Sequence, residues 1–367
     1  MRETSSSAGT SLPTTTGTYA PPLQAPPTHN RVVQVTRFGE PDGLAVVDAP
    51  MPAPRRGEIR VRVLASSINY TDTLIRRHLY PQTARLGLPF TMGYDVVGEV
   101  DQLGPDVRDF QIGDRVADMT VVGSNATYRI LKAKDAVRVP ARVDPAEAAT
   151  LILSWTTAYQ ILHRDARVRP GQRVLMQGAA GAVGQAVLVL GKLAGVDLWG
   201  TGRAEHAPII RGLGGVPIDY QREDFTRVLP EGFDVVIDGA GEDGYRRSFK
   251  ALRPGGLLCA IGYSARVRER QRIGAILTSI ARMYLWRFLP GGRRARFYSI
   301  NIMRARHPAW FKEDLSWLFD LLASGAIRPQ VAERISFDDV AEAHRRLESG
   351  GLAGKLVLCP ELPSRTA

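Results

Sequence analysis

The sequence Gln177-Gly178-Ala179-Ala180-Gly181-Ala182-Val183-Gly184 separates an apolar run from a helical pattern. The run before it is Arg173–Met176, and the helical stretch after it is Gln185–Leu193. A strand, a turn of small residues and a helix in this order form the phosphate-binding element of dinucleotide-binding folds. Gly181 allows the backbone to approach a pyrophosphate, and Gly184 allows the helix to pack close to the strand. We therefore predict that this helix N-terminus binds a dinucleotide, whose phosphates the helix dipole attracts.

The motif alone is a weak signal, because Ala179 replaces the first glycine of the usual G-x-G-x-x-G pattern and glycine turns also join ordinary strands and helices. Its surroundings strengthen the prediction. Strand-like runs alternate with helical stretches after it, which predicts a parallel sheet covered by helices on both faces. Gly200, Gly239 and Gly262 fall at the carboxyl ends of these strands, where ligands of such sheets bind. The strand-like runs are Val196–Trp199, Gly215–Tyr220, Phe233–Asp238 and Gly256–Gly262.

Length and composition indicate a two-domain globular protein. The chain has 367 residues, 44% of them hydrophobic, and no apolar run long enough to span a membrane. Its two cysteines, Cys259 and Cys359, lie far apart in apolar stretches, which favours reduced thiols and a cytoplasmic location over a disulfide. Residues 1–30 are rich in Ser, Thr and Pro and have no apolar core, so we predict a disordered tail, with a transit peptide as the alternative.

The chain on either side of the nucleotide-binding segment predicts a second, mainly β domain. Short strand-like runs between Gly and Pro turns, such as Arg31–Phe38, Leu44–Asp48 and Glu58–Ile68, are typical of a small barrel. Pro145–His163 is predicted to be a long connecting helix. The last elements should rejoin this first domain. They are a helix at Trp310–Gly325, a strand at Val331–Ile335, a helix at Phe337–Glu348 and a strand at Gly354–Leu358.

The positive charge is concentrated in one segment. The formal net charge is +11, and Ser264–His307 contains eleven arginines and a single acid, Glu269, around a helical pattern at Ile273–Leu289. The simplest interpretation is a solvated, arginine-rich face. Two alternatives remain: a site for a cofactor phosphate or an anionic or carrier-bound substrate, and a basic helix lying on anionic lipid. No nucleic-acid-binding module is visible in the sequence, so nucleic acid is not expected as a partner.

Several motifs in a fixed order resemble those of a known family. They are Ile68–Asp72, Gly113–Val116, Thr157–Tyr159, Ala179–Gly184, Pro217–Tyr220 and Gly354-Lys355. The chain resembles the medium-chain dehydrogenase/reductases, and within them the zinc-free branch of quinone oxidoreductases, zeta-crystallin, 2-enoyl thioester reductases and synaptic-vesicle-membrane-protein-like chains. The resemblance implies an α/β protein with a GroES-like β-barrel catalytic domain (31–152 and 308–367) and a Rossmann domain with a doubly wound parallel sheet (153–307). It further implies NADPH and substrate in the cleft between them, and a homodimer formed through the edge of the cofactor sheet.

The departures from the family pattern concern its metal. Zinc-dependent members of the superfamily have a Cys-His pair where this chain has Asn69-Tyr70, and a His-Glu pair where it has Tyr94-Asp95. Asn and Tyr are poor zinc ligands, so no metal is predicted, and a rebuilt site of Asp72, Asp95 and His78 is the minor alternative. Without a metal to polarise a carbonyl, hydride transfer to a conjugated C=C is easier than reduction of an isolated ketone.

The resemblance and the tip of the second strand favour NADPH as the coenzyme. Arg203 stands at or beside the place where NAD-dependent members have an acid, and its guanidinium can pair with a 2′-phosphate. The family often has a lysine where this chain has His206, and Glu205 opposes an anion. Tyr220 is expected near the adenine or its phosphate, with core packing as the alternative. The predicted cofactor-binding residues are Thr157, Ala180, Gly181, Ala182, Val183, Gly202, Arg203, Tyr220, Gly239, Gly262 and Lys355.

Three residues are candidates for catalysis. Asn69 and Tyr80 are eleven positions apart, as in the quinone and enoyl reductases, and in the enoyl reductases the tyrosine at this place is the proposed proton donor. A phenol with a pKa near 10 can donate its proton to a developing enolate. Asn69 is expected to orient the nicotinamide ribose or the substrate, and Tyr70 falls where zinc enzymes have part of a proton relay. Packing is the alternative role for Tyr70 and Tyr80, and His78 is expected to face solvent.

The sequence therefore predicts a zinc-independent, NADPH-dependent reductase that transfers hydride to a quinone or to the C=C of an α,β-unsaturated carbonyl. Two alternative functions remain. One is a tailoring enoyl- or ketoreductase that acts on a large or carrier-bound natural-product intermediate. The other is an NADPH-binding protein of a membrane surface or of a partner complex, with little turnover.

Overall fold

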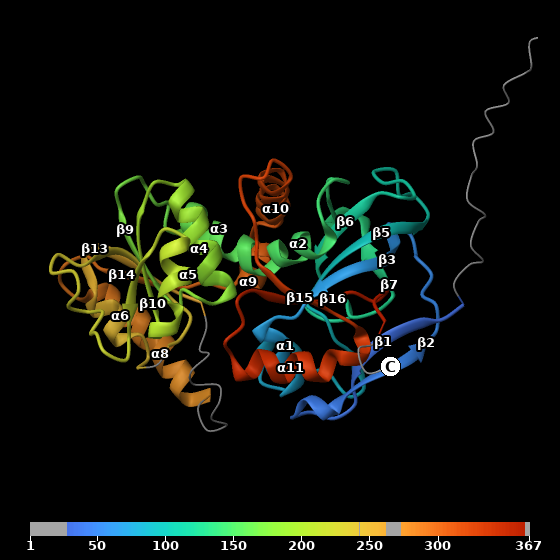
Figure 1. Ribbon diagram of the computed structural model, residues 1–367, viewed down its shortest axis with the longest axis horizontal. Helices are drawn as coiled ribbons and strands as arrows, with labels where there is room; N and C mark the ends of the chain where they lie inside the picture. The colour runs from blue at the N-terminus through green and yellow to red at the C-terminus, as the bar shows by residue number, and fades with distance from the viewer. Residues whose placement is uncertain (1–27, 242, 262–272, 364–367) are drawn as a thin grey trace, which may run out of the picture.

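The computed structural model describes residues 28–241, 243–261 and 273–363, which form two lobes (Figure 1). A parallel-sheet lobe lies on the left of the view and a barrel lobe on the right. Three helices lie between the lobes: α2 (Pro145–Thr150), α9 (Ile300–Arg306) and α10 (Pro308–Ala323).

The parallel-sheet lobe contains six strands in the order β11-β10-β9-β12-β13-β14. All five pairings are parallel. The order reverses between β9 and β12, as in a Rossmann sheet, and ligands of such sheets bind in the crevice at this point. The predicted doubly wound parallel sheet is confirmed. The strands are β9 (Arg173–Gln177), β10 (Asp197–Gly202), β11 (Val216–Asp219), β12 (Phe233–Asp238), β13 (Leu252–Ala260) and β14 (Arg294–Phe297).

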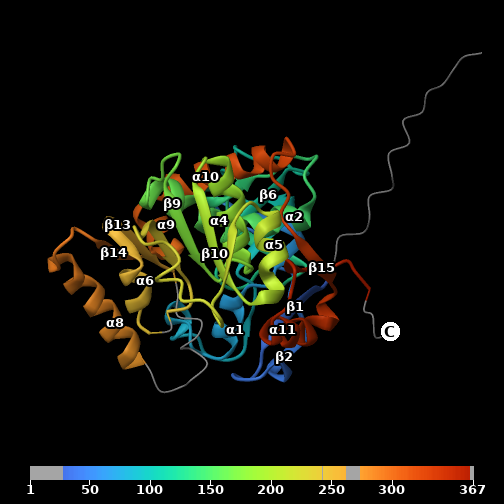
Figure 2. The same ribbon diagram turned by 60° about the vertical axis from the view of Figure 1, so that its left-hand side comes forward.

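The edge strand β14 has no counterpart among the predicted strands. Its sequence, RARF, carries little apolar surface, and most of it is exposed because the strand pairs with β13 alone. The helix predicted just before it is present as α8 (Ile273–Leu285), which stands out from the edge of the lobe in Figure 2. The other helices of this lobe are α4 (Ala182–Leu193), α5 (Ala207–Gly212) and α6 (Arg246–Lys250).

The barrel lobe is built from a seven-stranded sheet and a three-stranded sheet. The strands are antiparallel apart from the parallel pair β15–β16. Alternate residues of the central strand β3 point into the core, where Ile59, Val61 and Val63 are buried. The predicted GroES-like domain is confirmed. Its strands are β1 (Asn30–Val35), β2 (Leu44–Ala49), β3 (Glu58–Ser67), β4 (Phe90–Thr91), β5 (Asp95–Leu103), β6 (Arg115–Met119), β7 (Tyr128–Lys132), β8 (Val137–Arg138), β15 (Val331–Ile335) and β16 (Lys355–Leu358).

The C-terminal part of the chain returns to the barrel lobe, as the sequence predicts. β16 pairs with the end of β3 through Val357 and Ser67, and α11 (Val340–Ser349) lies beside α1 (Tyr70–Arg76) (Figure 1). At the other end, β1 already begins at Asn30, the last residue assigned to the predicted tail. Residues 1–27 of that tail lie outside the described residues.

The connection between the lobes is helical from Pro145 to Asp165, close to the predicted range. It is not a single α-helix, because Leu151–Trp155 and Gln160–Asp165 are wound as π-helix on either side of α3 (Thr156–Tyr159). The wider turn lets the Thr156 hydroxyl donate to the carbonyl of residue 151 at 3.1 Å. π-Helical turns are frequent at functional sites, and Thr157 lies in the short α-helix between these two.

Two further observations concern the cysteines and the helices. Cys259 and Cys359 are both free thiols. No helix in the described ranges combines the length and the apolar character needed to cross a bilayer.

Candidate functional site

The predicted nucleotide turn can receive phosphates. Helix α4 begins after Gly181, and the first N–H groups of such a helix lack partners within the helix and attract anions. A Cβ on Gly184 would lie 2.5 Å from the carbonyl oxygen of Gly178, so only glycine permits this close packing. These features fit a pyrophosphate. The residues of the turn that are at least partly exposed are Gly178, Ala180, Gly181, Ala182 and Val183.

A second feature suited to anions lies at the end of β10. Arg203 is exposed, and its Nε lies 3.4 Å from the hydroxyl of Tyr220, which follows β11. Tyr220 is 44% exposed, which excludes the alternative of core packing. The Glu205 carboxylate lies 3.4 Å from the same guanidinium, so it offsets part of the positive charge of this surface. A Cβ on Gly202 would lie 3.0 Å from the side chain of His206, so the strand ends in a tight turn. The structure thus brings two predicted residues together on one open surface.

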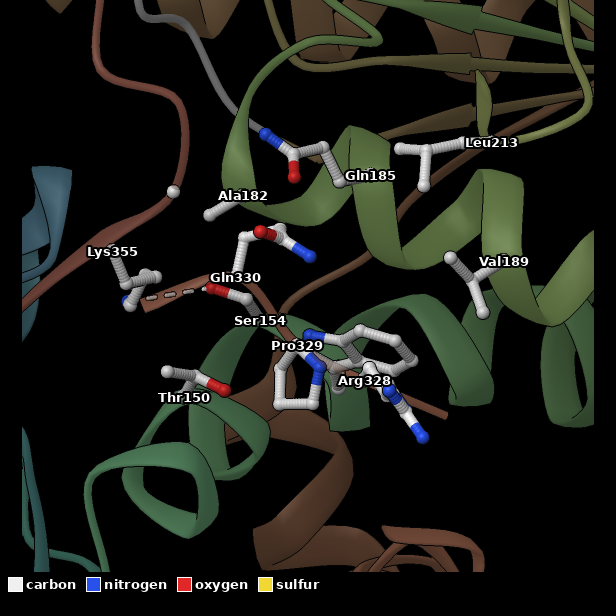
Figure 3. Close-up of a pocket in the computed structure, with 12 residues that line it drawn as sticks. Thr150, Ser154, Ala182, Gln185, Val189, Leu213, Arg328, Pro329, Gln330 and Lys355 are labelled. Atoms are coloured by element: carbon white, nitrogen blue, oxygen red, sulfur yellow. Dashed lines mark hydrogen bonds between the residues drawn. The ribbon is translucent and has the colours of Figure 1, made fainter. Parts of the chain in front are cut away.

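A small pocket lies where the two lobes meet beside the turn (Figure 3). Ala182 and Gln185 of α4 line it from the parallel-sheet lobe, and Ser154, Gln330 and Lys355 line it from the opposite side. Its volume is about 20 Å³, which accommodates roughly one water molecule and no nicotinamide ring. The pocket therefore marks the contact between the lobes, and it places Lys355 close to the predicted phosphate site.

The remaining predicted cofactor residues lie in different surroundings. Thr157 is buried, at 7% exposure. Gly239 follows β12. In this turn the Asp238 carboxylate accepts hydrogen bonds from the backbone N–H groups of Ala240 and Gly241, at 2.8 and 3.0 Å. Gly262 lies outside the described residues. Contact of these residues with a cofactor stays a prediction.

Tyr80 belongs to a cluster of three polar side chains. Its hydroxyl lies 2.8 Å from that of Tyr94, and the amide nitrogen of Asn301 donates to both hydroxyls, at 2.8 and 2.7 Å. Tyr94 is only 1% exposed, whereas Tyr80 is partly exposed. Burial raises the pKa of both phenols above their usual value, so both are protonated at neutral pH. Hydrogen bonds therefore orient Tyr80, and its phenol has a proton to give.

Asn69 lies in a buried ionic cluster directly before α1. Its amide nitrogen donates to the Asp95 carboxylate at 2.9 Å and to the Ser67 carbonyl at 3.0 Å, and its amide oxygen accepts a hydrogen bond from the ammonium group of Lys355. Asn69 is 3% exposed, and both of its amide hydrogens are engaged inside the protein. The structure therefore shows Asn69 holding Lys355 and Asp95 together. Its direct contact with the ribose or the substrate stays a prediction, as does the relay role of the half-buried Tyr70.

Lys355 supplies the positive charge of this ionic cluster. The residue is 7% exposed, and its ammonium group also lies 3.5 Å from the hydroxyl of Ser154 (Figure 3). Burial raises the pKa of Asp72 to about 7 and raises that of Asp95, and the charge of Lys355 counteracts both shifts. Burial also lowers the pKa of Lys355, which the two carboxylates counteract. The cation and the carboxylates thus depend on one another to remain charged in the interior.

The side chains at the family's metal position do not fit a zinc ion. Amide and phenol groups replace thiolate and imidazole, and the ammonium group of Lys355 is bonded to Asn69, so a second cation here would be repelled. His78 is exposed and packs on Phe38, with 4.2 Å between ring centroids, whereas Asp72 is buried. The alternative metal site that included His78 is therefore not assembled. Within the part of the chain that the structure describes, no group of three His, Cys, Asp or Glu side chains could hold a metal.

Part of the arginine-rich segment forms ion pairs inside the molecule. Arg304 of α9 donates to the Asp118 carboxylate and to the Met119 carbonyl of β6, both at 2.6 Å. Arg296 of β14 pairs with Asp165 at 2.8 Å. A solvated face therefore does not describe Arg304, whose side chain is 19% exposed, whereas Arg296 is paired and still 52% exposed. The first arginines of the segment, up to residue 272, lie outside the described residues.

Sequence reasoning missed two members of the tyrosine cluster. From the sequence, Tyr94 is notable only as a poor zinc ligand at the family's metal position, and Asn301 has no predicted role. Asn301 lies 221 positions from Tyr80, in a segment that the sequence marks only by its arginines. No local pattern connects the three residues, so only the fold shows that they meet.

Comparison with known proteins agrees with the fold. Residues 55–141 match the alcohol dehydrogenase GroES-like domain, and residues 214–358 match the zinc-binding dehydrogenase family. A quinone oxidoreductase from Pseudomonas aeruginosa is 31% identical over 336 residues, which cover 89% of this chain and 99% of the relative. A 2-haloacrylate reductase from Burkholderia is 28% identical over 345 residues, which cover 89% and 98%. The structure of mycobacterial Rv1454c complexed with NADPH has a TM-score of 0.77 at 28% identity and covers 90% of this chain and 100% of its own.

The two-lobe architecture with its nucleotide turn and these relatives define an oxidoreductase of a family that binds nicotinamide cofactors. The chain belongs to the quinone oxidoreductase branch of the medium-chain dehydrogenase/reductase superfamily.

Proposed function

We propose that the protein is a zinc-independent, NADPH-dependent reductase of quinones or of the C=C bond of α,β-unsaturated carbonyl compounds. The observation that carries this proposal is the closed ionic cluster at the family's metal position. Lys355 provides the positive charge there and donates a hydrogen bond to the Asn69 amide oxygen. The Asn69 amide nitrogen donates to the Asp95 carboxylate, whose charge Lys355 also stabilises. A reductase without a metal ion has no Lewis acid to polarise the substrate carbonyl. Its substrate must accept hydride without that polarisation, as conjugated alkenes and quinones do.

The coenzyme, when bound, supplies a hydride. The protein binds its phosphates at the N-terminus of α4 and its 2′-phosphate at Arg203 and Tyr220, and Tyr80 supplies a proton to an enolate. The 2-haloacrylate reductase supports the choice of a conjugated alkene, since acrylates have a C=C next to a carboxyl group. The P. aeruginosa relative supports a quinone, and Rv1454c complexed with NADPH supports the coenzyme.

The proposal is tested by turnover after removal of metal ions. We expect the protein, dialysed exhaustively against a strong chelator, to oxidise NADPH with a panel of quinones and enones at the rate of the untreated sample, because no step needs a metal. Consumption of NADPH and formation of the reduced product are measured together. Loss of turnover that added zinc restores would contradict the metal-free mechanism, and absence of turnover in both samples would contradict the reductase.

Coenzyme choice should depend on Arg203. The change Arg203→Ala removes the cation facing the 2′-phosphate, so we expect the KM for NADPH to rise about 10- to 100-fold, the effect of losing a charged hydrogen bond. The KM for NADH should stay within about twofold, because NADH has no 2′-phosphate for Arg203 to bind. Steady-state kinetics with both coenzymes measure the ratio. The control is Arg211→Ala, an exposed arginine of α5 in the same lobe. Equal losses for the two coenzymes would show that Arg203 does not select NADPH.

The same proposal includes the assembly and location expected from the sequence. We propose a cytoplasmic homodimer that forms through the edge of the cofactor sheet, where β14 pairs on one side only among the described strands. The proposed substrate is a small molecule, and an anionic or carrier-bound substrate at the arginine-rich segment 264–307 is a further part of the proposal.

A further inference from the structure

The hydrogen-bond pattern around Tyr80 determines which phenol gives its proton away. The amide nitrogen of Asn301 has two hydrogens and no acceptor capacity, and it donates one to Tyr80 and one to Tyr94. Tyr94 is buried, so its hydroxyl hydrogen needs an acceptor within the protein. Among the hydrogen bonds described for it, the Tyr80 hydroxyl at 2.8 Å is the acceptor. Tyr80 then accepts two hydrogen bonds, and its own hydrogen points away from both partners.

We propose that Tyr94 and Asn301 are positioning residues that direct the Tyr80 proton toward the substrate and stabilise the Tyr80 phenolate after that proton has left. This inference rests on the proposed reduction of an enone and adds the two groups that make Tyr80 its acid. A bound coenzyme would supply the hydride for the new C–H bond at the β-carbon, and the electrons of the C=C would move onto the carbonyl oxygen. The O–H bond of Tyr80 then breaks as the α-carbon takes the proton, and water later restores the phenol.

The electrostatics of the cluster agree with this direction of donation. Against the effect of burial, the hydrogen bonds from Tyr94 and Asn301 lower the pKa of Tyr80. The bond with Tyr80 has the opposite effect on Tyr94, whose pKa it raises further. A charge on Tyr80 is therefore stabilised by hydrogen bonds from both neighbours, whereas a charge on Tyr94 is stabilised by the one from Asn301 alone. Two hydrogen-bond donors aimed at one oxygen act as an oxyanion hole does.

Three different parts of the chain supply the cluster. Tyr80 follows α1, Tyr94 precedes β5, and Asn301 stands in α9. Arg304, one helical turn after Asn301, fixes α9 to the barrel lobe through its ion pair with the buried Asp118. The guanidinium also lies 4.3 Å from the ring centroid of Phe311. The amide of Asn301 thus has a rigid base and can hold both hydroxyls in place.

The first test measures the Tyr80 pKa directly. Tyrosine labelled with 13C at Cζ reports ionisation by NMR, and Tyr80→Phe assigns the signal. We expect Tyr94→Phe, which keeps the ring and removes the donated hydrogen bond, to raise the Tyr80 pKa by about one unit or more. Asn301→Leu should do the same. Tyr128→Phe is the matched control, because Tyr128 lies on β7 of the same lobe and is absent from the cluster's hydrogen bonds.

The second test compares two kinds of substrate. For an enone, we expect Tyr94→Phe and Asn301→Leu to lower kcat by about 10- to 100-fold, the effect of removing one donor from an oxyanion hole. The KM for the enone and the Kd of NADPH should stay within about twofold. For a quinone, kcat should change by less than about threefold, since the hydroquinone anion is stable enough to take its proton from water.

These outcomes separate the inference from the proposed function. If the wild type reduces neither substrate, the proposed function fails, and the NMR titration still tests the hydrogen-bond donation in the resting protein. If the Tyr80 pKa is unchanged in both variants, or if enone and quinone turnover fall equally, the inference is wrong. Thermal unfolding of each variant shows whether it folds, and either of the two variants suffices for the test.

Discussion

Replacing Lys355 by methionine should lower the free energy of unfolding by about 3–5 kcal/mol at neutral pH, the effect of leaving buried charges without their partner. Lys355 provides the ammonium group within the ionic cluster of Asn69, Asp72 and Asp95. Methionine has a similar length and no charge, so the change removes the cation with little change of volume. Chemical denaturation, followed by circular dichroism, measures the difference.

The loss should depend on pH in a defined direction. Burial raises the pKa of Asp72 from 3.8 to about 7, so the folded protein binds more protons than the unfolded chain between these values, and stability falls as pH rises through this window. Without Lys355, the pKa values of Asp72 and Asp95 rise further, which extends the window upward. The variant should therefore be closest to the wild type in acid, where both carboxyls are neutral, and should fall behind as pH rises.

Two further variants make this prediction specific. Lys312→Met is the same chemical change at an exposed lysine of α10 and should leave stability within about 0.5 kcal/mol of the wild type. The double variant Lys355→Met with Asp95→Asn should regain part of the loss, because it no longer has to bury the Asp95 charge. A Lys355→Met protein as stable as the Lys312→Met protein at every pH would show that the cluster does not depend on its cation.

Gly184→Ala should weaken the binding of NADPH. A Cβ at this position would lie 2.5 Å from the carbonyl oxygen of Gly178 and 2.6 Å from two backbone atoms of Ala179. Backbone atoms cannot move aside as a flexible side chain can, so the turn must shift away from the start of α4. We expect the Kd for NADPH to rise by at least about tenfold, and stability to fall by about 1–3 kcal/mol, as for overpacking of a core.

The control for this change is Gly212→Ala in α5. It adds the same methyl group in the same lobe, at a position with no atom within 4 Å of the added carbon. We expect NADPH binding equal to that of the wild type and a gain of about 0.5–1 kcal/mol, because alanine favours the helix. Fluorescence titration with NADPH and thermal unfolding measure both effects. Wild-type affinity in Gly184→Ala would mean that NADPH does not use this turn.

The sequence by itself determined the fold and the place of the glycine turn before α4. The alternation of strands and helices from Arg173 onward predicted the parallel sheet, and the order of the strands in space agrees with it. Such predictions succeed because strand periodicity, turn glycines and helix starts are properties of neighbouring residues. The same reasoning missed β14, because its short, arginine-rich strand is defined by its neighbour β13 and not by a pattern of its own.

The tertiary structure alone decided how the polar residues of the site pair. Tyr80 was a candidate from sequence, but its partner Asn301 arrives from a helix 221 positions away. The sequence predicts Lys355 as a cofactor-binding residue. In the structure its ammonium group donates a hydrogen bond to Asn69, 286 positions away. A side-chain hydrogen bond requires two groups within about 3 Å and in the right orientation. Packing of distant elements sets that geometry, and no local pattern in the chain records it.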